Sequence, residues 1–189
     1  MSAGGVRLLW PEPGFVTDQP TATDAADVED PTVVSVVGPS GAGKTTLVED
    51  LVAAFEDRRV ATIKSIHHDI EPDTAGTDTH RHRTAGADTA VGITPELTFE
   101  VSRGGKGSDR TDSDAELAAL RRTLDRLTAR GFDLVLVEGF SAAPLPTIHA
   151  GERDEIDPNR IGTGEDSLET LRRAIEAADP IDPESLSGR

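Results

Sequence analysis

Eight consecutive residues in the first quarter of the chain combine glycine, lysine and threonine in a pattern suited to phosphate chemistry. Positions 38–45 read Gly-Pro-Ser-Gly-Ala-Gly-Lys-Thr, which matches G-x-x-x-x-G-K-[ST]. In this pattern the glycines let backbone N–H groups converge on phosphate oxygens, Lys44 reaches the β- and γ-phosphates, and the Thr45 hydroxyl binds Mg²⁺. The residues predicted to surround a magnesium-bound nucleoside triphosphate are Gly38, Ser40, Gly41, Ala42, Gly43, Lys44, Thr45 and Thr46.

A phosphate-binding loop of this kind needs a strand before it and a helix after it. Residues 33–37 form a continuous apolar run, which is typical of a buried strand. Residues 44–56 follow a helical pattern, and the apolar side chains expected on one face are Leu47, Leu51, Val52 and Phe55. The first turn of this helix adds unpaired N–H groups and the positive end of the helix dipole to the site.

A carboxylate ends the most apolar strand of the chain, which is predicted at residues 132–137. In parallel sheets, functional residues gather beyond the carboxyl ends of the strands, where the phosphate-binding loop also lies. We therefore expect Glu138 to bind the Mg²⁺ ion, usually through a water molecule, and to be the candidate catalytic residue that orients an attacking water. Gly139 is expected to let the backbone pass close to the phosphates.

The remaining pattern alternates strands and helices. Further strands are predicted at 60–64 and 147–150, together with a strand pair at 89–94 and 97–102 that is joined at Pro95-Glu96. Helices are predicted at 79–87, 113–130 and 166–177, and the second of them opens with a capping box from Ser113 to Glu116. This order predicts an α/β fold, a P-loop NTPase-like three-layer sandwich with a mostly parallel sheet. A nucleotide-binding domain is expected at 32–178, between a flexible acidic N-terminal tail (1–31) and a C-terminal tail (179–189), with a mobile loop at 103–112.

The composition is strongly acidic. The 189 residues include 35 Asp and Glu against 19 Lys and Arg, a formal net charge of -16, and only three lysines, at positions 44, 64 and 106. This charge argues against nucleic acid as a partner, and it resembles the composition of halophilic proteins from salt-loaded cytoplasms. The absence of cysteine excludes disulfides and thiolate metal sites. With no apolar run of membrane-spanning length and no signal pattern, we expect a cytoplasmic protein with no membrane partner.

Histidine and carboxylate residues concentrate between positions 64 and 83, directly after the second predicted strand. One interpretation is a metal site with ligands from His67, His68, Asp69, Asp73 and Asp78. The other is recognition of a polar substrate, with carboxylates near Mg²⁺ and Arg81 and Arg83 contacting phosphate or a partner. Adjacent histidines do not readily face one ion, which favours the second interpretation.

Four sequence blocks in fixed order resemble the MobB family of molybdopterin-guanine dinucleotide biosynthesis adaptor proteins. They are G-x-S-G-x-G-K-T-T-L at 38–47, I-K-x-x-H-H-D at 63–69, G-x-D-[ST] at 76–79 with R-x-x-G-A at 83–87, and D-L-V-L-V-E-G-F at 133–140. The resemblance covers residues 32 to 150. The chain departs from the family pattern at Ser65, where histidine is common, and at Ser141, where lysine is frequent.

The resemblance implies a P-loop protein that binds GTP with Mg²⁺ and is at most a weak GTPase. It also implies a homodimer that assists a MobA-like molybdenum cofactor guanylyltransferase, with molybdopterin as a further candidate ligand. By the same resemblance, Lys44 and Thr45 hold phosphate and Mg²⁺, and Asp78 and Glu138 line the nucleotide site. The chain contains no N-K-x-D motif for reading guanine, so the residues alone also allow ATP.

Two other function classes use the same kind of loop. A metallochaperone GTPase of the nickel-delivery type would share the histidine-rich and aspartate-rich segment, although the chain lacks cysteine and a His-rich N-terminal tract. A small-molecule P-loop kinase would need a lid with arginines that close on the donor phosphates. The glycine-rich segment 103–110 could form such a lid, but its position in the chain argues against it.

Overall fold

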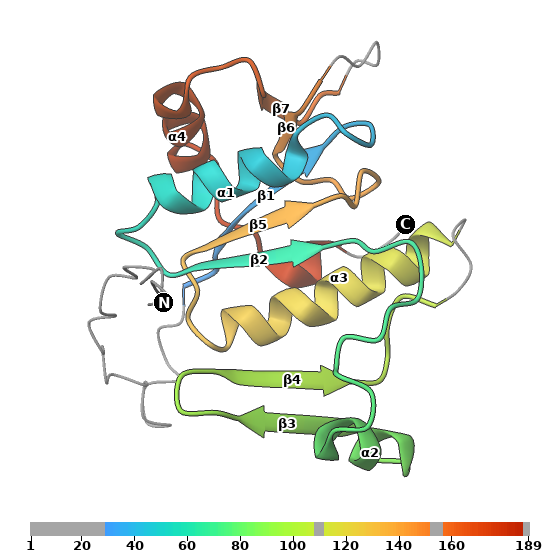
Figure 1. Cartoon of the computed structure of the whole chain (residues 1–189). Coiled ribbons are helices and arrows are strands. Elements are labelled where there is room, and N and C mark those ends of the chain that lie inside the picture. Colours follow the sequence, from blue (N-terminus) through green and yellow to red (C-terminus); the bar gives the residue numbers. More distant parts are fainter. Residues whose placement is uncertain (1–28, 108–111, 152–156, 187–189) are drawn as a thin grey trace, which may run out of the picture.

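A parallel five-stranded sheet forms the centre of the molecule (Figure 1). The computed structural model describes residues 29–107, 112–151 and 157–186. The strand order is β2-β5-β1-β6-β7, and every neighbouring pair is parallel. The strands are β1 (Thr32–Val37), β2 (Val60–Lys64), β5 (Leu134–Glu138), β6 (Thr147–His149) and β7 (Arg160–Thr163). The carboxyl ends of all five strands therefore meet at one edge of the sheet.

Helices cover both faces of this sheet (Figure 1). The helices α1 (Lys44–Ala54) and α4 (Leu168–Glu176) pack on one face, and α3 (Ser113–Thr128) and the 3₁₀ helix η1 (Pro183–Leu186) pack on the other. Because both faces are covered, β1 is buried along its whole length and β5 is buried up to Val137. The predicted α/β fold, a P-loop NTPase-like three-layer sandwich, is confirmed.

The buried face of α1 differs slightly from the predicted one. Val48, Leu51 and the following Phe55 are buried, whereas Val52 is 38% exposed. Positions 48, 51 and 55 recur at three- and four-residue spacing and so face the sheet together, which leaves position 52 at the border of the apolar face. On α3, Leu120 and Leu124 are buried as the periodicity predicts.

An antiparallel hairpin lies outside the main sheet (Figure 1). It consists of β3 (Thr89–Ile93) and β4 (Thr98–Ser102), preceded by the short helix α2 (Asp78–Thr84). The hairpin is joined to α3 by an ion pair of 2.7 Å between Arg126 and Glu100. The predicted strand pair is confirmed, although it forms a sheet of its own.

The end of the described chain is packed, which corrects the expected C-terminal tail from residue 179. The backbone N–H of Ile181 donates to the carbonyl of Pro31 at 3.0 Å, and Leu186 is 3% exposed against the layer of α3. Two apolar side chains are thus enough to hold this proline-rich segment. The predicted N-terminal tail as far as residue 28 and the last three residues, 187–189, lie outside the described residues.

Two local features were also predicted differently. Strand β7 was not predicted, because residues 160–163 contain one large apolar side chain and a glycine. The cap of α3 is Asp112, whose Oδ1 accepts from the N–H of Ala115 at 2.8 Å, rather than Ser113. Within the part of the chain that the structure describes, no helix is long and apolar enough to cross a membrane.

Candidate functional site

Three strand ends define the candidate site. The phosphate-binding loop follows β1, Glu138 ends β5, and Lys64 ends β2. In the sheet register, Glu138 is aligned with Val36 on one side and with Lys64 on the other. This places the loop, the carboxylate and a lysine side by side at the carboxyl edge, as expected for a functional site of a parallel sheet.

The loop makes close contact with the neighbouring strand end. A Cβ atom at Gly38 would lie 2.0 Å from the carbonyl oxygen of Ala150, so only glycine fits at this position. The ammonium of Lys44 lies over the loop and donates to the carbonyls of Gly38 at 3.0 Å and Pro39 at 2.7 Å. The loop and its lysine therefore form one compact unit at the start of α1.

Oxygen atoms that suit Mg²⁺ face each other across the loop and β5. The Thr45 hydroxyl donates to the Glu138 carboxylate at 3.2 and 3.3 Å. Hydroxyl and carboxylate oxygens are the ligands that Mg²⁺ takes in nucleotide sites, usually together with water and phosphate. These two residues fit the predicted metal site, since a small shift of either side chain would admit an ion between them.

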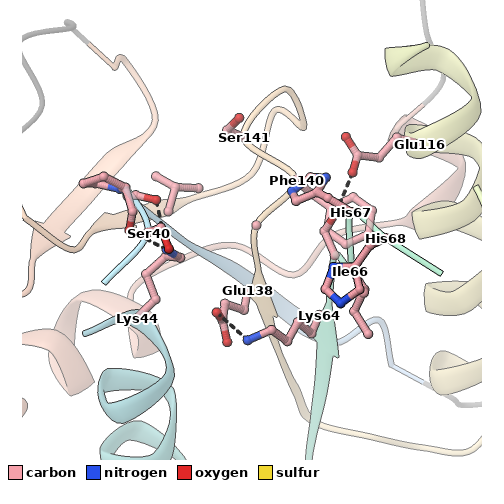
Figure 2. Close-up of a pocket in the computed structure, with 15 residues that line it drawn as sticks. Ser40, Lys44, Lys64, Ile66, His67, His68, Glu116, Glu138, Phe140 and Ser141 are labelled. Carbon is pink, nitrogen blue, oxygen red and sulfur yellow. Dashed lines mark hydrogen bonds and ion pairs between the residues drawn. The ribbon is translucent and has the colours of Figure 1, made fainter. Parts of the chain in front are cut away.

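Lys64 also contacts this pair of residues, and its ion pair with Glu138 is drawn in Figure 2. Its Nζ atom donates to Glu138 Oε1 at 2.8 Å and lies 3.4 Å from the Thr45 hydroxyl oxygen. The side chain of Glu138 is 12% exposed, whereas that of Lys64 is 53% exposed. The carboxylate is therefore fixed near the sheet, and the lysine reaches it from the solvent side.

A cavity of about 730 Å³ opens beside these groups (Figure 2). Five of the predicted site residues line it: Gly38, Ser40, Lys44, Glu138 and Gly139. Thr45 adjoins it through its contact with Glu138. The other lining residues are Val37, Pro39, Lys64, Ser65, Ile66, His67, His68, Glu116, Phe140 and Ser141. Gly41, Ala42, Gly43 and Thr46 belong to the loop and first helical turn but do not line the cavity.

Asp78 lies elsewhere, at the start of α2. Its side chain is 86% exposed and pairs with Arg81 at 3.5 Å. It borders a separate hollow formed by α2 and the turn before it, together with His80 and His82. Asp78 was expected to lie beside the phosphates, but the structure places it at α2, outside the cavity.

The histidine and carboxylate segment is divided between these two places. His67 and His68 line the cavity, whereas Asp78, His80 and His82 border the hollow at α2. Among the residues that the structure describes, no group of three or more His, Cys, Asp or Glu side chains is arranged to hold one metal ion. The interpretation of this segment as a single metal site is thus not supported.

Gly139 has a packing role that the sequence did not reveal. Its φ angle is +98°, and a Cβ atom there would lie 2.9 Å from the Cβ of Ser65. The absence of a side chain lets the backbone after β5 approach the residue that follows β2. The Ser65 N–H donates to the Glu138 carbonyl at 2.9 Å and continues the pairing of the two strands past their ends.

A third lysine reaches the far wall of the cavity from the predicted mobile loop. Lys106 Nζ lies 2.6 Å from Glu116 Oε1, donates to the Ser65 hydroxyl, and lies 5.7 Å from the ring centre of Phe140. Burial raises the pKa of Glu116, but hydrogen bonds from Lys106 and Ser65 outweigh this effect and hold the pKa below its usual range. The predicted mobile loop is therefore anchored at Lys106, and residues 108–111 lie outside the described part.

Lys64, Ser65, Lys106 and Glu116 were not among the predicted site residues. The scarcity of lysine could have pointed to two of them, because only three of the 19 basic residues are lysines; Lys44 and Lys64 line the cavity and Lys106 contacts two of its lining residues. In the sequence, Ser65 stands out as a departure from the family pattern and Glu116 as part of a capping box, but their contacts with Lys106 are long-range and could not be predicted.

A parallel sheet with a phosphate-binding loop after β1 and an acidic residue at the end of β5 defines a P-loop NTPase-like nucleotide-binding fold. The family model described as "Molybdopterin guanine dinucleotide synthesis protein B" (MobB) matches residues 33–168. The chain belongs to this MobB family.

Two relatives with similar sequences are named as adapter proteins of molybdopterin-guanine dinucleotide biosynthesis. The molybdopterin-guanine dinucleotide biosynthesis adapter protein of Haemophilus influenzae is 34% identical over 118 residues, 61% of this chain and 61% of that protein. The adapter protein of Escherichia coli is 32% identical over 123 residues, 61% of this chain and 66% of that protein. The matched region therefore spans slightly less than two thirds of each relative.

Solved structures share the fold. The crystal structure of Bacillus subtilis MobB aligns with a TM-score of 0.54 and 21% identity, covering 75% of this chain and 96% of that one. A crystal structure of molybdopterin-guanine biosynthesis protein B aligns with a TM-score of 0.52 and 23% identity, covering 77% and 98%. At this level of identity the likeness concerns the fold alone.

Proposed function

We propose that this protein binds Mg²⁺ and GTP at the carboxyl edge of its sheet and serves as an adaptor in molybdopterin guanine dinucleotide synthesis in the cytoplasm. Its partner in this proposal is a MobA-like guanylyltransferase that uses or receives the bound nucleotide. The observation that carries the proposal is the contact between Thr45 and Glu138 beside Lys44. These residues bring a metal-binding hydroxyl, a carboxylate and a phosphate-binding ammonium to one cavity.

The proposed nucleotide and the proposed pathway are supported by different observations. The loop geometry supports a triphosphate with Mg²⁺, since loop N–H groups, Lys44 and Thr45 provide the usual contacts. Membership of the MobB family supports the molybdopterin guanine dinucleotide pathway and hence guanine as the base. We also propose molybdopterin as a further ligand of this chain, and only its membership of the MobB family supports this.

Weak hydrolysis fits the residues around the cavity. The lining residues that the structure describes supply lysines and histidines, and no arginine is among them. Efficient hydrolysis of GTP generally uses an arginine that stabilises charge on the phosphates, supplied by the protein itself or by a partner. We therefore expect the isolated protein to hydrolyse GTP slowly, with Glu138 positioned to orient the water.

A homodimer is the proposed assembly. Four large apolar side chains of the hairpin are exposed, namely Val91 (51%), Ile93 (81%), Leu97 (69%) and Phe99 (40%). Val91 and Ile93 share one face of the hairpin, whereas Phe99 lies on the other face, opposite Gly92. Burial of the face with Val91 and Ile93 against a second copy would remove apolar surface from water. Light scattering after size exclusion should give a dimer mass, and Ile93→Asp should shift the protein toward the monomer.

The experiment that tests the proposed function is calorimetric binding of GTP and ATP, with Mg²⁺, in buffer of high salt concentration. The wild-type protein should bind GTP more tightly than ATP, and Lys44→Ala should weaken both by roughly tenfold or more because a charged hydrogen bond to phosphate is lost. Equal binding of ATP would favour a kinase over a GTP-dependent adaptor. If Lys44→Ala left triphosphate affinity unchanged, the proposed site would be wrong.

A further inference from the structure

Lys64 occupies a position that the proposed function does not explain. It ends β2, directly beside Glu138 at the end of β5, and its ammonium donates to the Glu138 oxygen at 2.8 Å. The same ammonium lies 3.4 Å from the Thr45 hydroxyl. Lys64 thus contacts both residues that are proposed to bind Mg²⁺, although it belongs to neither the loop nor β5.

The Lys64 ammonium and a Mg²⁺ ion would compete for the Glu138 carboxylate. A lysine ammonium at 2.8 Å from Glu138 Oε1 and a Mg²⁺ ion on the same carboxylate would repel each other strongly at the edge of a buried sheet. Direct binding of the ion to Glu138 would therefore displace Lys64 from the carboxylate. The lysine side chain can move away, because it is 53% exposed and has a flexible four-carbon stem.

In the proposed complex, the terminal phosphate of the nucleotide is the acceptor that a displaced Lys64 ammonium would meet. Lys64 lines the same cavity as Lys44 and Ser40. In the proposed complex, Lys44 binds the β- and γ-phosphates and Thr45 binds the ion that bridges them. An ammonium that starts 3.4 Å from the Thr45 hydroxyl therefore lies within reach of the terminal phosphate.

We propose that Lys64 is a second phosphate-binding lysine, which distinguishes a nucleoside triphosphate from a diphosphate. With a diphosphate bound, Lys64 stays on Glu138 and competes with Mg²⁺ for the carboxylate. With a triphosphate bound, Lys64 transfers to the γ-phosphate and leaves Glu138 to the ion. The inference rests on the proposed function, since it assigns a role in the same nucleotide site.

A purely structural role accounts less well for these contacts. Because the Lys64 side chain is 53% exposed, water screens its ion pair with Glu138, and the pair contributes little to stability. The chain uses arginine for 16 of its 19 basic residues and lysine for three; Lys44 and Lys64 line this cavity, and Lys106 contacts its lining residues Ser65 and Glu116. A compact ammonium can leave a carboxylate more readily than a guanidinium that binds both oxygens at once, which suits a residue that exchanges partners.

The test compares GTP and GDP affinities, and the Mg²⁺ affinity of the GDP complex, in wild type and in two variants. Lys64→Met keeps the length of the stem and removes the charge, so GTP should bind roughly tenfold more weakly while GDP stays within about twofold. Mg²⁺ should bind the GDP complex of Lys64→Met more tightly, because the competing cation is gone. Lys64→Arg should weaken Mg²⁺ binding to the GDP complex, because a guanidinium can pair with both oxygens of the Glu138 carboxylate and holds it more firmly.

A matched control removes the same charge elsewhere. Arg173→Met takes away a cation that pairs with Glu169 at 2.7 Å on the exposed face of α4, and it should leave all three affinities unchanged. Equal losses of GTP and GDP affinity in Lys64→Met, or no loss of either, would overturn the role of Lys64 while leaving the proposed function intact. If the wild-type protein bound neither GTP nor ATP, the proposed function would fail and the role of Lys64 with it.

Discussion

The hydroxyl of Thr45 lies 3.2 Å from the carboxylate of Glu138, although 93 positions separate the two residues in the chain. The contact exists because β1 and β5 are parallel neighbours and α1 begins directly after the loop that follows β1. The sheet thereby delivers a hydroxyl and a carboxylate to one point at its carboxyl edge.

Glu138→Gln should weaken nucleotide binding only when Mg²⁺ is present. The substitution keeps the shape of the side chain but removes the charge that attracts the ion, so affinity for GTP with Mg²⁺ should fall roughly tenfold. With the ion removed by a chelator, the variant and the wild type should bind GTP about equally. Titration calorimetry under both conditions measures this, with Glu169→Gln on the surface of α4 as the control. Equal weakening under both conditions would show that Glu138 acts on the fold rather than on the ion.

Gly139→Ala should destabilise the protein by about 2 kcal/mol. The residue has a φ angle of +98°, and the added methyl group would lie 2.9 Å from the Cβ of Ser65, so the strained backbone and the close contact both oppose folding. Gly105→Ala is the matched control, because no atom lies within 4 Å of its added Cβ and its φ angle is not in the left-handed region. Urea unfolding measures the free energy of unfolding of both variants and of the wild type. Similar stabilities would contradict the packing role of Gly139.

The sequence predicted those parts of the fold and site that local patterns determine. The apolar runs of β1 and β5 and the loop motif between β1 and α1 each lie within about ten residues, and parallel topology then brings Lys44 and Glu138 to the same edge. The helical periodicity of α3 likewise predicted the burial of Leu120 and Leu124. Such features follow from side-chain spacing and from the rule on strand ends.

Long-range contacts determine the parts that could not be predicted. Residues 65–77 and 103–107 have no apolar periodicity, so nothing local shows that Lys106 reaches Glu116 and Ser65 while Asp78 lies at the separate hollow of α2. Strand β7 has a single large apolar side chain and is held by pairing with β6. In each case the stabilising contact comes from a part of the chain that is distant in sequence, so the pattern of the segment itself does not reveal it.

Asp78→Asn should leave nucleotide affinity within about twofold of the wild-type value, because Asp78 borders the hollow at α2 and does not line the cavity. Asp78 is 86% exposed, and only its ion pair with Arg81 would be lost, which is worth little on a surface. Calorimetric titration with GTP and Mg²⁺ measures the affinity, and Lys44→Ala provides the positive control. A loss comparable to that of Lys44→Ala would place Asp78 in the nucleotide site, as the family resemblance implies.

The ion pair between Lys106 and Glu116 should contribute to stability at neutral pH and lose that contribution in acid. The pKa of Glu116 lies below its usual value of 4.5, so the folded state binds its proton less readily than the unfolded state does. The contribution is therefore complete above pH 4.5 and is lost as the pH falls through the lower pKa of the folded state. Glu116→Gln should cost about 1 kcal/mol at pH 7, and the difference from wild type should shrink below pH 4.5. Urea unfolding across this range checks the result, and a difference that does not change with pH would contradict it.

Salt should stabilise this protein. With 35 acidic and 19 basic residues, repulsion among carboxylates outweighs the ion pairs on the surface, and screening weakens repulsion as the Debye length falls from about 10 Å at 0.1 M to about 3 Å at 1 M salt. The midpoint of thermal unfolding should therefore rise between 0.1 and 1 M KCl. A further rise above 1 M, where screening is nearly complete, would support the adaptation to a salt-loaded cytoplasm that the composition suggests. A midpoint that is constant or falls over this range would show that the net charge of -16 does not limit stability.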